Sequence, residues 1–403
     1  MKPRRPSRAP GSPSRRPGAV RSVPSASSWP KLGWKLGVEV ELLAPRGKTR
    51  RDLAEALAKE TGGKVQVDLH RDSEPSKVPG MKVFWNLTPA FNVLDRKGRR
   101  GFRLVDDLTL QDDLDLHAPP LPGWYRIVSD DLRLLGLAQR HTVAGASIAR
   151  SLIPLGKLFG TRPQALPSGM FRLSDSAGAS VAMTLPLPGE RHRSCEVITA
   201  PLVKDHGAQL ESLLGTARAQ GFLIPQEGAV HLHFDGAPLR SAATVRNLVA
   251  LLHPYRALLK ALVKTNPRCR RLGPWPDALL TLVRQPGFTS LPWEKAREAL
   301  LGTGLQKYCD FNLMNFIRGV PGKETLEVRI LPVHLETQPI LDAARLFEAI
   351  LRRAERPVKF RQDAGETAAE ALRLFKEIAL PQDVTGRYLQ VLRGSSPAAL
   401  PAA

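Results

Sequence analysis

Alternation of apolar and polar residues recurs along the chain and predicts a series of β-strands. In the segment 35–43, KLGVEVELL, every second residue from Leu36 to Leu42 is apolar, which is the period of a strand with one buried face. Comparable patterns, separated by turn-rich polar segments, occur further along. The other predicted strands are 64–70, 82–95, 124–132, 179–187, 194–202, 229–235, 307–319 and 324–332.

Helical patterns lie between these strands. Thr49 is a suitable N-cap for a helix that has Asp52 in its first turn and stops at Gly62. Ser241 is a suitable N-cap for one long helix reaching about residue 263, with Val245, Leu248, Leu252, Leu259 and Leu262 along its apolar face. Further helices are predicted at 205–220, 293–301, 338–354 and 366–379.

The order of these elements predicts an α+β fold. Strands that follow one another as hairpins, with helices gathered between them, favour a largely antiparallel sheet with flanking helices. We expect a main folded domain over 32–355, with an insertion or mobile loop at about 133–178, where periodicity is weak. Residues 1–31 are expected to be a disordered tail, and 356–403 a helical extension with a disordered end.

Composition narrows the classes of protein. The 403 residues include 59 Lys and Arg against 38 Asp and Glu, giving a net charge of +21, and residues 1–38 contain nine of these bases and no acid. The Pro-, Arg- and Ser-rich composition of this tail indicates a solvated extension. Contact with nucleic acid is expected only through this tail. No apolar run approaches the roughly 18–20 residues of a membrane span, and no secretory signal or disulfide framework is evident among three scattered cysteines. We therefore expect a cytoplasmic protein without a membrane segment.

Four strands carry charged residues on the face opposite their apolar side chains. Each motif alone has an ordinary explanation, such as a solvated face or a cross-strand ion pair. Together they supply the carboxylates and imidazoles that a metal–nucleotide site on a sheet requires. The motifs are Glu39 and Glu41, Glu196, His231 and His233, and Glu327 and Arg329.

The donor types indicate which ion such a site would hold. Several carboxylates with imidazole and no thiolate favour Mg²⁺ or Mn²⁺ over a structural zinc. Crowded carboxylates repel one another, and a cation offsets that repulsion. Neither a Walker motif nor a dinucleotide-binding glycine motif occurs in the sequence. ATP, if it is used, must therefore bind on this sheet.

With these motifs in place, the sequence resembles the amidoligases, ATP-dependent carboxylate–amine ligases of the glutamine synthetase/glutamate–cysteine ligase superfamily. The matching segments lie between about residues 33 and 355. They are GVEVEL (37–42), CEVITAPL (195–202), GAVHLHFDG (228–236), YCDFNL (308–313) and TLEVRIL (325–331).

The resemblance implies a catalytic-domain fold like that of glutamine synthetase, with the sheet as the floor of the active site. It implies that Glu39 and Glu41 each serve one of two metal sites, and that Glu196 completes the site on the acceptor side. It further implies that His231 and Glu327 bind the metal nearer the ATP phosphates. His233 and Arg329 would lie against phosphate, and Arg270, Arg271 and Asn312 are further candidates for nucleotide or substrate contacts.

The implied activity joins a carboxylate and an amine into an amide or isopeptide bond, through an acyl phosphate, with ATP and Mg²⁺ or Mn²⁺. The substrates would be small molecules or peptides, and Asp130 and Asp131 match the family pattern only loosely because of the long segment before Glu196. Two other classes stay open. One is a zinc-dependent hydrolase that uses His231 and His233, and the other is a basic nucleic-acid-binding protein.

Overall fold

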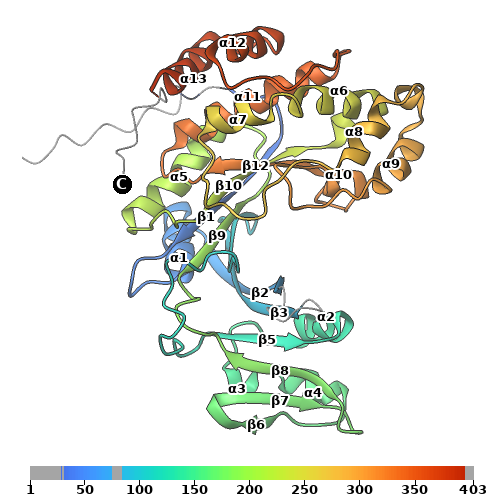
Figure 1. Ribbon diagram of the computed structural model, residues 1–403. Coiled ribbons are helices and arrows are strands. Elements are labelled where there is room, and N and C mark those ends of the chain that lie inside the picture. Colours follow the sequence, from blue (N-terminus) through green and yellow to red (C-terminus); the bar gives the residue numbers. More distant parts are fainter. Residues whose placement is uncertain (1–28, 30, 75–83, 395–403) are drawn as a thin grey trace, which may run out of the picture.

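The computed structural model describes residue 29 and residues 31–74 and 84–394 (Figure 1). Within these residues, twelve strands form one sheet, and every paired strand runs antiparallel to its neighbour. The order is β11-β12-β10-β1-β9-β4-β3-β5-β8-β7-β6, with β2 along β3. The strands are β1 Leu36–Leu43, β2 Lys64–Glu74, β3 Phe84–Leu94, β4 Arg100–Val105, β5 Tyr125–Ser129, β6 Gln164–Leu166, β7 Met170–Ser174, β8 Ser180–Pro186, β9 Ser194–Thr199, β10 Ala229–Asp235, β11 Phe311–Asn312 and β12 Thr325–Pro332. The predicted α+β class with a largely antiparallel sheet is confirmed.

Helices cover one face of the half of the sheet that contains β1, β10 and β12 (Figure 1). The apolar residues of β1 point into this layer, and Leu36, Val38 and Leu42 are fully buried there. The polar residues of the same strands must therefore point to the opposite face. The main helices are α1 Arg50–Thr61, α5 His206–Ala219, α6 Ala242–Leu252, α7 Arg256–Val263, α8 Asp277–Arg284, α9 Trp293–Leu301, α10 Met314–Arg318, α11 Thr337–Ala354, α12 Ala368–Glu377 and α13 Gln382–Gly394.

Helix α1 begins and ends where its capping residues predict. The Thr49 side chain accepts from the helix backbone, and Asp52 accepts from the Thr49 backbone N–H at 2.8 Å, which forms a capping box. Gly62 ends the helix in the left-handed conformation, at φ 62°. This cap fixes the position of the first helical residue, Arg50. Its side chain donates to the Ser194 carbonyl of β9 and contributes to the site described below.

Two predicted elements are wrong in length. The helix expected from Ser241 to about 263 is divided into α6 and α7, because Pro254 lies between them and cannot continue a helical hydrogen-bond ladder. The strand expected at 307–319 is reduced to β11, because Asn312 Oδ1 accepts from Met314 N–H at 2.8 Å and turns the chain into α10.

The segment 133–178, expected as an insertion or mobile loop, has regular structure. It contains most of α2 (Leu132–His141), followed by α3 (Ile148–Ser151), α4 (Ile153–Leu158), β6 and β7, which pack on β5 and β8 in the lower arm of Figure 1. Leu135, Leu152, Leu155 and Leu173 form a separate buried core there. The elements of this segment are too short to produce a readable periodicity. Outside it, the sequence analysis also did not predict β4, α8 and α13.

Most of the predicted tail at 1–31 and the end of the chain at 395–403 lie outside the described residues. Among the described residues, no helix combines the length and the apolar character that crossing a bilayer requires.

Candidate active site

Strand register brings the polar motifs of the sequence together on the uncovered face of the sheet. On β1, Glu39 lies opposite His231 of β10, and Glu41 lies opposite Glu196 of β9. On β12, Glu327 lies opposite His233 of β10 and also opposite Asn312 of β11. Five adjacent strands thus form one continuous polar surface. Gly37 belongs to the same face, and its missing side chain leaves room for His233, whose Cβ lies 3.3 Å from where a Gly37 Cβ would stand.

Two groups of three side chains have donor atoms close enough to share a metal ion. One group is Glu39, His233 and Glu327, and the other is Glu39, Glu196 and His231, with the donor atoms of each group within 4.8 Å of one another. Glu39 belongs to both groups, which suits a carboxylate that bridges two ions. The resemblance placed His231 with Glu327, whereas these groups place His233 with Glu327 and His231 with Glu196.

Glu41 lies at the edge of these groups. Its Oε2 accepts from Ala229 N–H at 2.7 Å, and its Oε1 lies 3.7 Å from His231 Nε2. Burial and the nearby charge of Asp107 raise the pKa of Glu41 well above its usual range. Burial and the charge of Glu39 do the same to the pKa of Glu196. These two carboxylates are held in surroundings that already contain negative charge, so the donor set fits a divalent cation.

The two histidines oppose this effect at Glu39. Burial alone would raise the Glu39 pKa, but His233 Nε2 at 3.1 Å and His231 Nδ1 at 3.3 Å hold it well below its usual range. Burial would lower the pKa of His233, but Glu39 and Glu327 raise it to about 9. Without a metal, a protonated His233 thus partly takes the place of a cation on this face.

Two neighbours fix the carboxylate of Glu327. Asn312 Nδ2 donates to Glu327 Oε2 at 2.6 Å, and Arg329 donates to Glu327 Oε1 at 2.5 Å. Burial raises the Glu327 pKa, but the positive charges of His233 and Arg329 outweigh it and lower the pKa. Asn312, named above as a candidate for nucleotide or substrate contacts, is buried and contacts Glu327, a position suited to orienting a metal ligand.

A polar cavity of about 150 Å³ lies over this face. Since a single water needs roughly 10–15 Å³ of such space, the cavity has room for ions with several waters. Glu39, Glu41, Glu196, His231 and Arg329 line it. Glu327 and His233 lie beside it, in contact with residues that line it.

Cationic side chains line the same cavity. Arg270, Arg271 and Lys307 do so together with Tyr308, whose ring centre lies 5.0 Å from the Arg271 guanidinium carbon and 5.0 Å from Lys307 Nζ. Arg270 also pairs with Asp112 at 3.0 Å. Positive groups and carboxylates around one cavity suit a phosphate group that a divalent ion bridges to carboxylates. Arg270 and Arg271, the candidates for nucleotide or substrate contacts, thus line the cavity.

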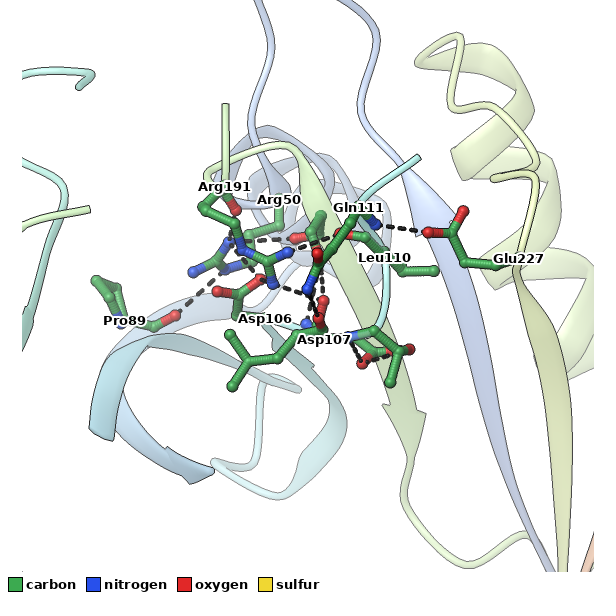
Figure 2. A network of polar contacts seen from close by, with 11 residues as sticks. Arg50, Pro89, Asp106, Asp107, Leu110, Gln111, Arg191 and Glu227 are labelled. Atoms are coloured by element: carbon green, nitrogen blue, oxygen red, sulfur yellow. Dashed lines mark hydrogen bonds and ion pairs between the residues drawn. The ribbon is translucent and has the colours of Figure 1, made fainter. Parts of the chain in front are cut away.

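A loop after β4 supplies acidic residues that the sequence analysis missed (Figure 2). Asp106, Asp107, Thr109 and Glu227 line the cavity. Arg191 donates to Asp106 Oδ1, to the Asp107 carbonyl and to the Leu110 carbonyl, each at 2.6 Å. The run VDDLTLQDDLD directly after a strand was the available signal.

Arg50 contacts the same loop through Asp106, whose Oδ1 lies 3.8 Å from Arg50 Nη1. The Arg50 side chain is fully buried and donates to the carbonyls of Pro89, Arg191 and Ser194 at 3.3, 2.8 and 3.1 Å. Glu227 ties down the far end by accepting from Gln111 N–H at 2.6 Å. Other cavity residues that were not predicted are His70, Asp72 and Cys269. Asp130 and Asp131 do not belong to the site: Asp131 caps α2, and neither lines the cavity.

These features define a protein with a candidate metal- and phosphate-binding site on an antiparallel sheet. The family model described as "Putative amidoligase enzyme" matches residues 32–351, and the chain belongs to this amidoligase family. The family supports a ligase-type enzymatic activity.

Solved structures add little to this assignment. A structure described as "Crystal structure of novel glutamine synthase homolog" aligns with 86% of this chain and 70% of its own, at 16% identity and a TM-score of 0.30. At that TM-score the likeness carries no argument about the site. A search of curated proteins finds no match.

Proposed function

We propose that the protein is a Mg²⁺- or Mn²⁺-dependent ligase that uses ATP to join a carboxylate to an amine. The observation that carries this proposal is that the carboxylate face containing Glu39, Glu196 and Glu327 lies at a cavity that several cationic side chains also line. A hydrolase would need only part of this arrangement. The amide or isopeptide product would come from small-molecule or peptide substrates, and we expect it to form in the cytoplasm.

The reaction has two steps. An oxygen of the substrate carboxylate attacks the γ-phosphorus of ATP, the bond to the β–γ bridging oxygen breaks, and ADP leaves with that electron pair. The amine nitrogen, after losing a proton, then attacks the carbonyl carbon of the acyl phosphate. The C–N bond forms, the C–O bond to phosphate breaks, and inorganic phosphate leaves. No side chain needs to act as a covalent nucleophile.

The chain's own residues would bind and orient the reactants. Glu39, Glu41, Glu196, His231, His233 and Glu327 would hold the divalent ions, which supply charge neutralisation at the phosphates when bound. Arg329 would stabilise the negative charge that develops on the transferred phosphoryl group, and Arg271 and Lys307 would bind phosphate oxygens. Asn312 would keep the Glu327 carboxylate oriented.

The zinc-hydrolase alternative uses His231 and His233 on one ion. However, each of the two donor groups contains one histidine and two carboxylates. Such sets suit hard ions better than zinc. A nucleic-acid role would depend on the basic tail, most of which lies outside the described residues.

Thermal unfolding with and without Mg²⁺–ATP tests the proposal. Nucleotide at a hundred times its dissociation constant should stabilise the wild type by about 2.7 kcal/mol, and Glu327→Gln should lose this stabilisation. Glu348→Gln is a matched control, because Glu348 is a buried carboxylate that accepts from Gly33 N–H, away from the cavity. Stabilisation by Zn²⁺ but not by Mg²⁺–ATP would favour the hydrolase, and no response to either would refute the ligase.

A further inference from the structure

A second cavity adjoins the first one. It measures about 190 Å³, and its walls come from β3, β5 and the segments after β4 and β8. Asn86 and Thr88 of β3 line it, and Asp106 lines both cavities. The two spaces therefore meet at one carboxylate, which Figure 2 shows beside Arg191 and Arg50. None of the motifs that identified the first cavity belongs to the second.

Several buried polar atoms in this cavity lack hydrogen-bond partners among the described residues. Asn86 is fully buried, and neither its Oδ1 nor its Nδ2 has a hydrogen-bond partner among the described residues. The same holds for Thr88 Oγ1, for Asp106 Oδ2 and for Arg191 Nε, in side chains that are at most 6% exposed. Buried polar atoms are nearly always paired, and leaving them unpaired lowers stability. Five such atoms around one cavity therefore indicate a binding site for a polar ligand.

The atoms concerned indicate the ligand's chemistry. Asp106 Oδ2 and Asn86 Oδ1 accept hydrogen bonds, whereas Asn86 Nδ2 and Arg191 Nε donate them. Arg126 also lines the cavity, beside Arg191 and Asp106. Leu116, Leu187 and Pro188 supply an apolar wall. The ligand that matches all three features carries an ammonium group, a carboxylate and a short apolar part.

We propose that the second cavity binds a free α-amino acid, with its ammonium group on Asp106 and its carboxylate towards Arg191 and Arg126. This inference rests on the proposed function in one respect: it identifies the amino acid as the amine substrate. Asp106 is the wall that the two cavities share, so an amino group held there lies on the side next to the metal face. The apolar wall then contacts the side chain.

Isothermal titration calorimetry of the full chain with each of the twenty standard amino acids, without nucleotide, tests the site. At least one should bind with a dissociation constant in the millimolar range or tighter, whereas its N-acetyl and methyl-ester derivatives should not bind. Thr88→Val and Asn86→Leu should each weaken binding about ten- to hundredfold, because each removes hydrogen bonds to a charged ligand. Both variants should melt at or above the wild-type temperature, since they remove unpaired buried polar atoms.

Thr142→Val is the matched control. Thr142 Oγ1 is also buried and has no hydrogen-bond partner in the described part of the chain, but it lies at the end of α2, outside both cavities. This variant should bind the amino acid as the wild type does. Binding that is equal in Thr88→Val, Asn86→Leu and the wild type would overturn the proposal, as would binding of the derivatives or no binding of any amino acid.

The two proposals fail separately. Glu327→Gln should lose stabilisation by Mg²⁺–ATP and keep amino-acid binding, whereas Thr88→Val should do the reverse. Amino-acid binding in a protein that never responds to Mg²⁺–ATP would leave the second cavity assigned and reject the ligase. A response to Mg²⁺–ATP without amino-acid binding would reject only the amino-acid site.

Discussion

Asn312 Nδ2 donates a 2.6 Å hydrogen bond to Glu327 Oε2, while Asn312 Oδ1 accepts from Met314 N–H at 2.8 Å. The second bond fixes which end of the amide faces Glu327. The carboxylate is therefore held in one orientation before any ion arrives. Groups that orient a metal ligand in this way usually contribute ten- to hundredfold to metal affinity.

Replacing Asn312 by Asp tests this relationship. The new side chain keeps the acceptor for Met314 N–H but loses the donor and places a second carboxylate against Glu327. We expect metal affinity to fall about ten- to hundredfold, measured by calorimetric titration with Mn²⁺. Asn247→Asp is the control, because Asn247 is equally buried but donates to the carbonyls of Ala354 and Arg356. It should lower stability and spare metal affinity, and equal losses in both variants would contradict the orienting role.

Arg329 gives a second prediction. Its 2.5 Å contact with Glu327 holds it over the metal face. Burial would lower the Arg329 pKa, but the charge of Glu327 raises it, so the guanidinium stays positively charged. Arg329→Gln should reduce ATP turnover by about a thousandfold, because an arginine that stabilises a transferring phosphoryl group acts mainly in the transition state. The affinity for Mg²⁺–ATP, measured by thermal stabilisation, should fall much less than the turnover. Turnover that survives the substitution would remove Arg329 from the proposed mechanism.

We expect Glu196 to lower the stability of the metal-free protein while contributing to metal binding. Burial and the charge of Glu39 raise its pKa, so the metal-free fold loses stability when the pH rises and the side chain ionises. Glu196→Gln should therefore raise the metal-free unfolding free energy by about 1 kcal/mol, measured in urea with a chelator present. The same variant should lose stabilisation by Mg²⁺. A variant that is less stable than the wild type without metal would show that the carboxylates do not repel one another.

The strands that carry the site could be predicted because alternation is a local property. Glu39, His231 and Glu327 each stand out between apolar neighbours, and capping residues such as Thr49 are local too. Which residue faces which across strands depends instead on pairing register. The register between β10 and β12 shifts between Val230 and Leu232, and this shift puts His233 instead of Phe234 opposite Glu327.

The loop after β4 could not be predicted for a different reason. Asp106 and Asp107 are held at the site by residues distant in the sequence: Arg191 donates to the carbonyls of Asp107 and Leu110, and Arg50 forms an ion pair with Asp106. Such long-range contacts leave no period in the sequence. Asn86 and Thr88 were missed because their strand pattern is that of an ordinary sheet, and only the cavity above them distinguishes these residues.

A last prediction concerns pH and the C-terminal helix α13. Asp383 accepts from Arg345 at 2.6 Å and from Arg387 at 2.9 Å, and the bond from Arg345 leads a set of contacts that lower the Asp383 pKa to about 2. A depressed folded-state pKa contributes stability that is present above the unfolded value, about 3.9, and is lost as the pH falls through about 2. Because the Asp383 side chain is 52% exposed, solvent and salt screen the pair, and its contribution should stay below about 1 kcal/mol.

Asp383→Asn should therefore be slightly less stable than the wild type at pH 6, with the difference shrinking as the pH approaches 2 and as salt is added. Hydrogen exchange of α13 amides measures this locally, since the helix can open without global unfolding. The Mg²⁺–ATP response should be the same in both proteins, because Asp383 lies far along the chain from every strand of the site. A difference between the two proteins that persists unchanged at pH 2 would mean that Asp383 acts through packing, not through charge.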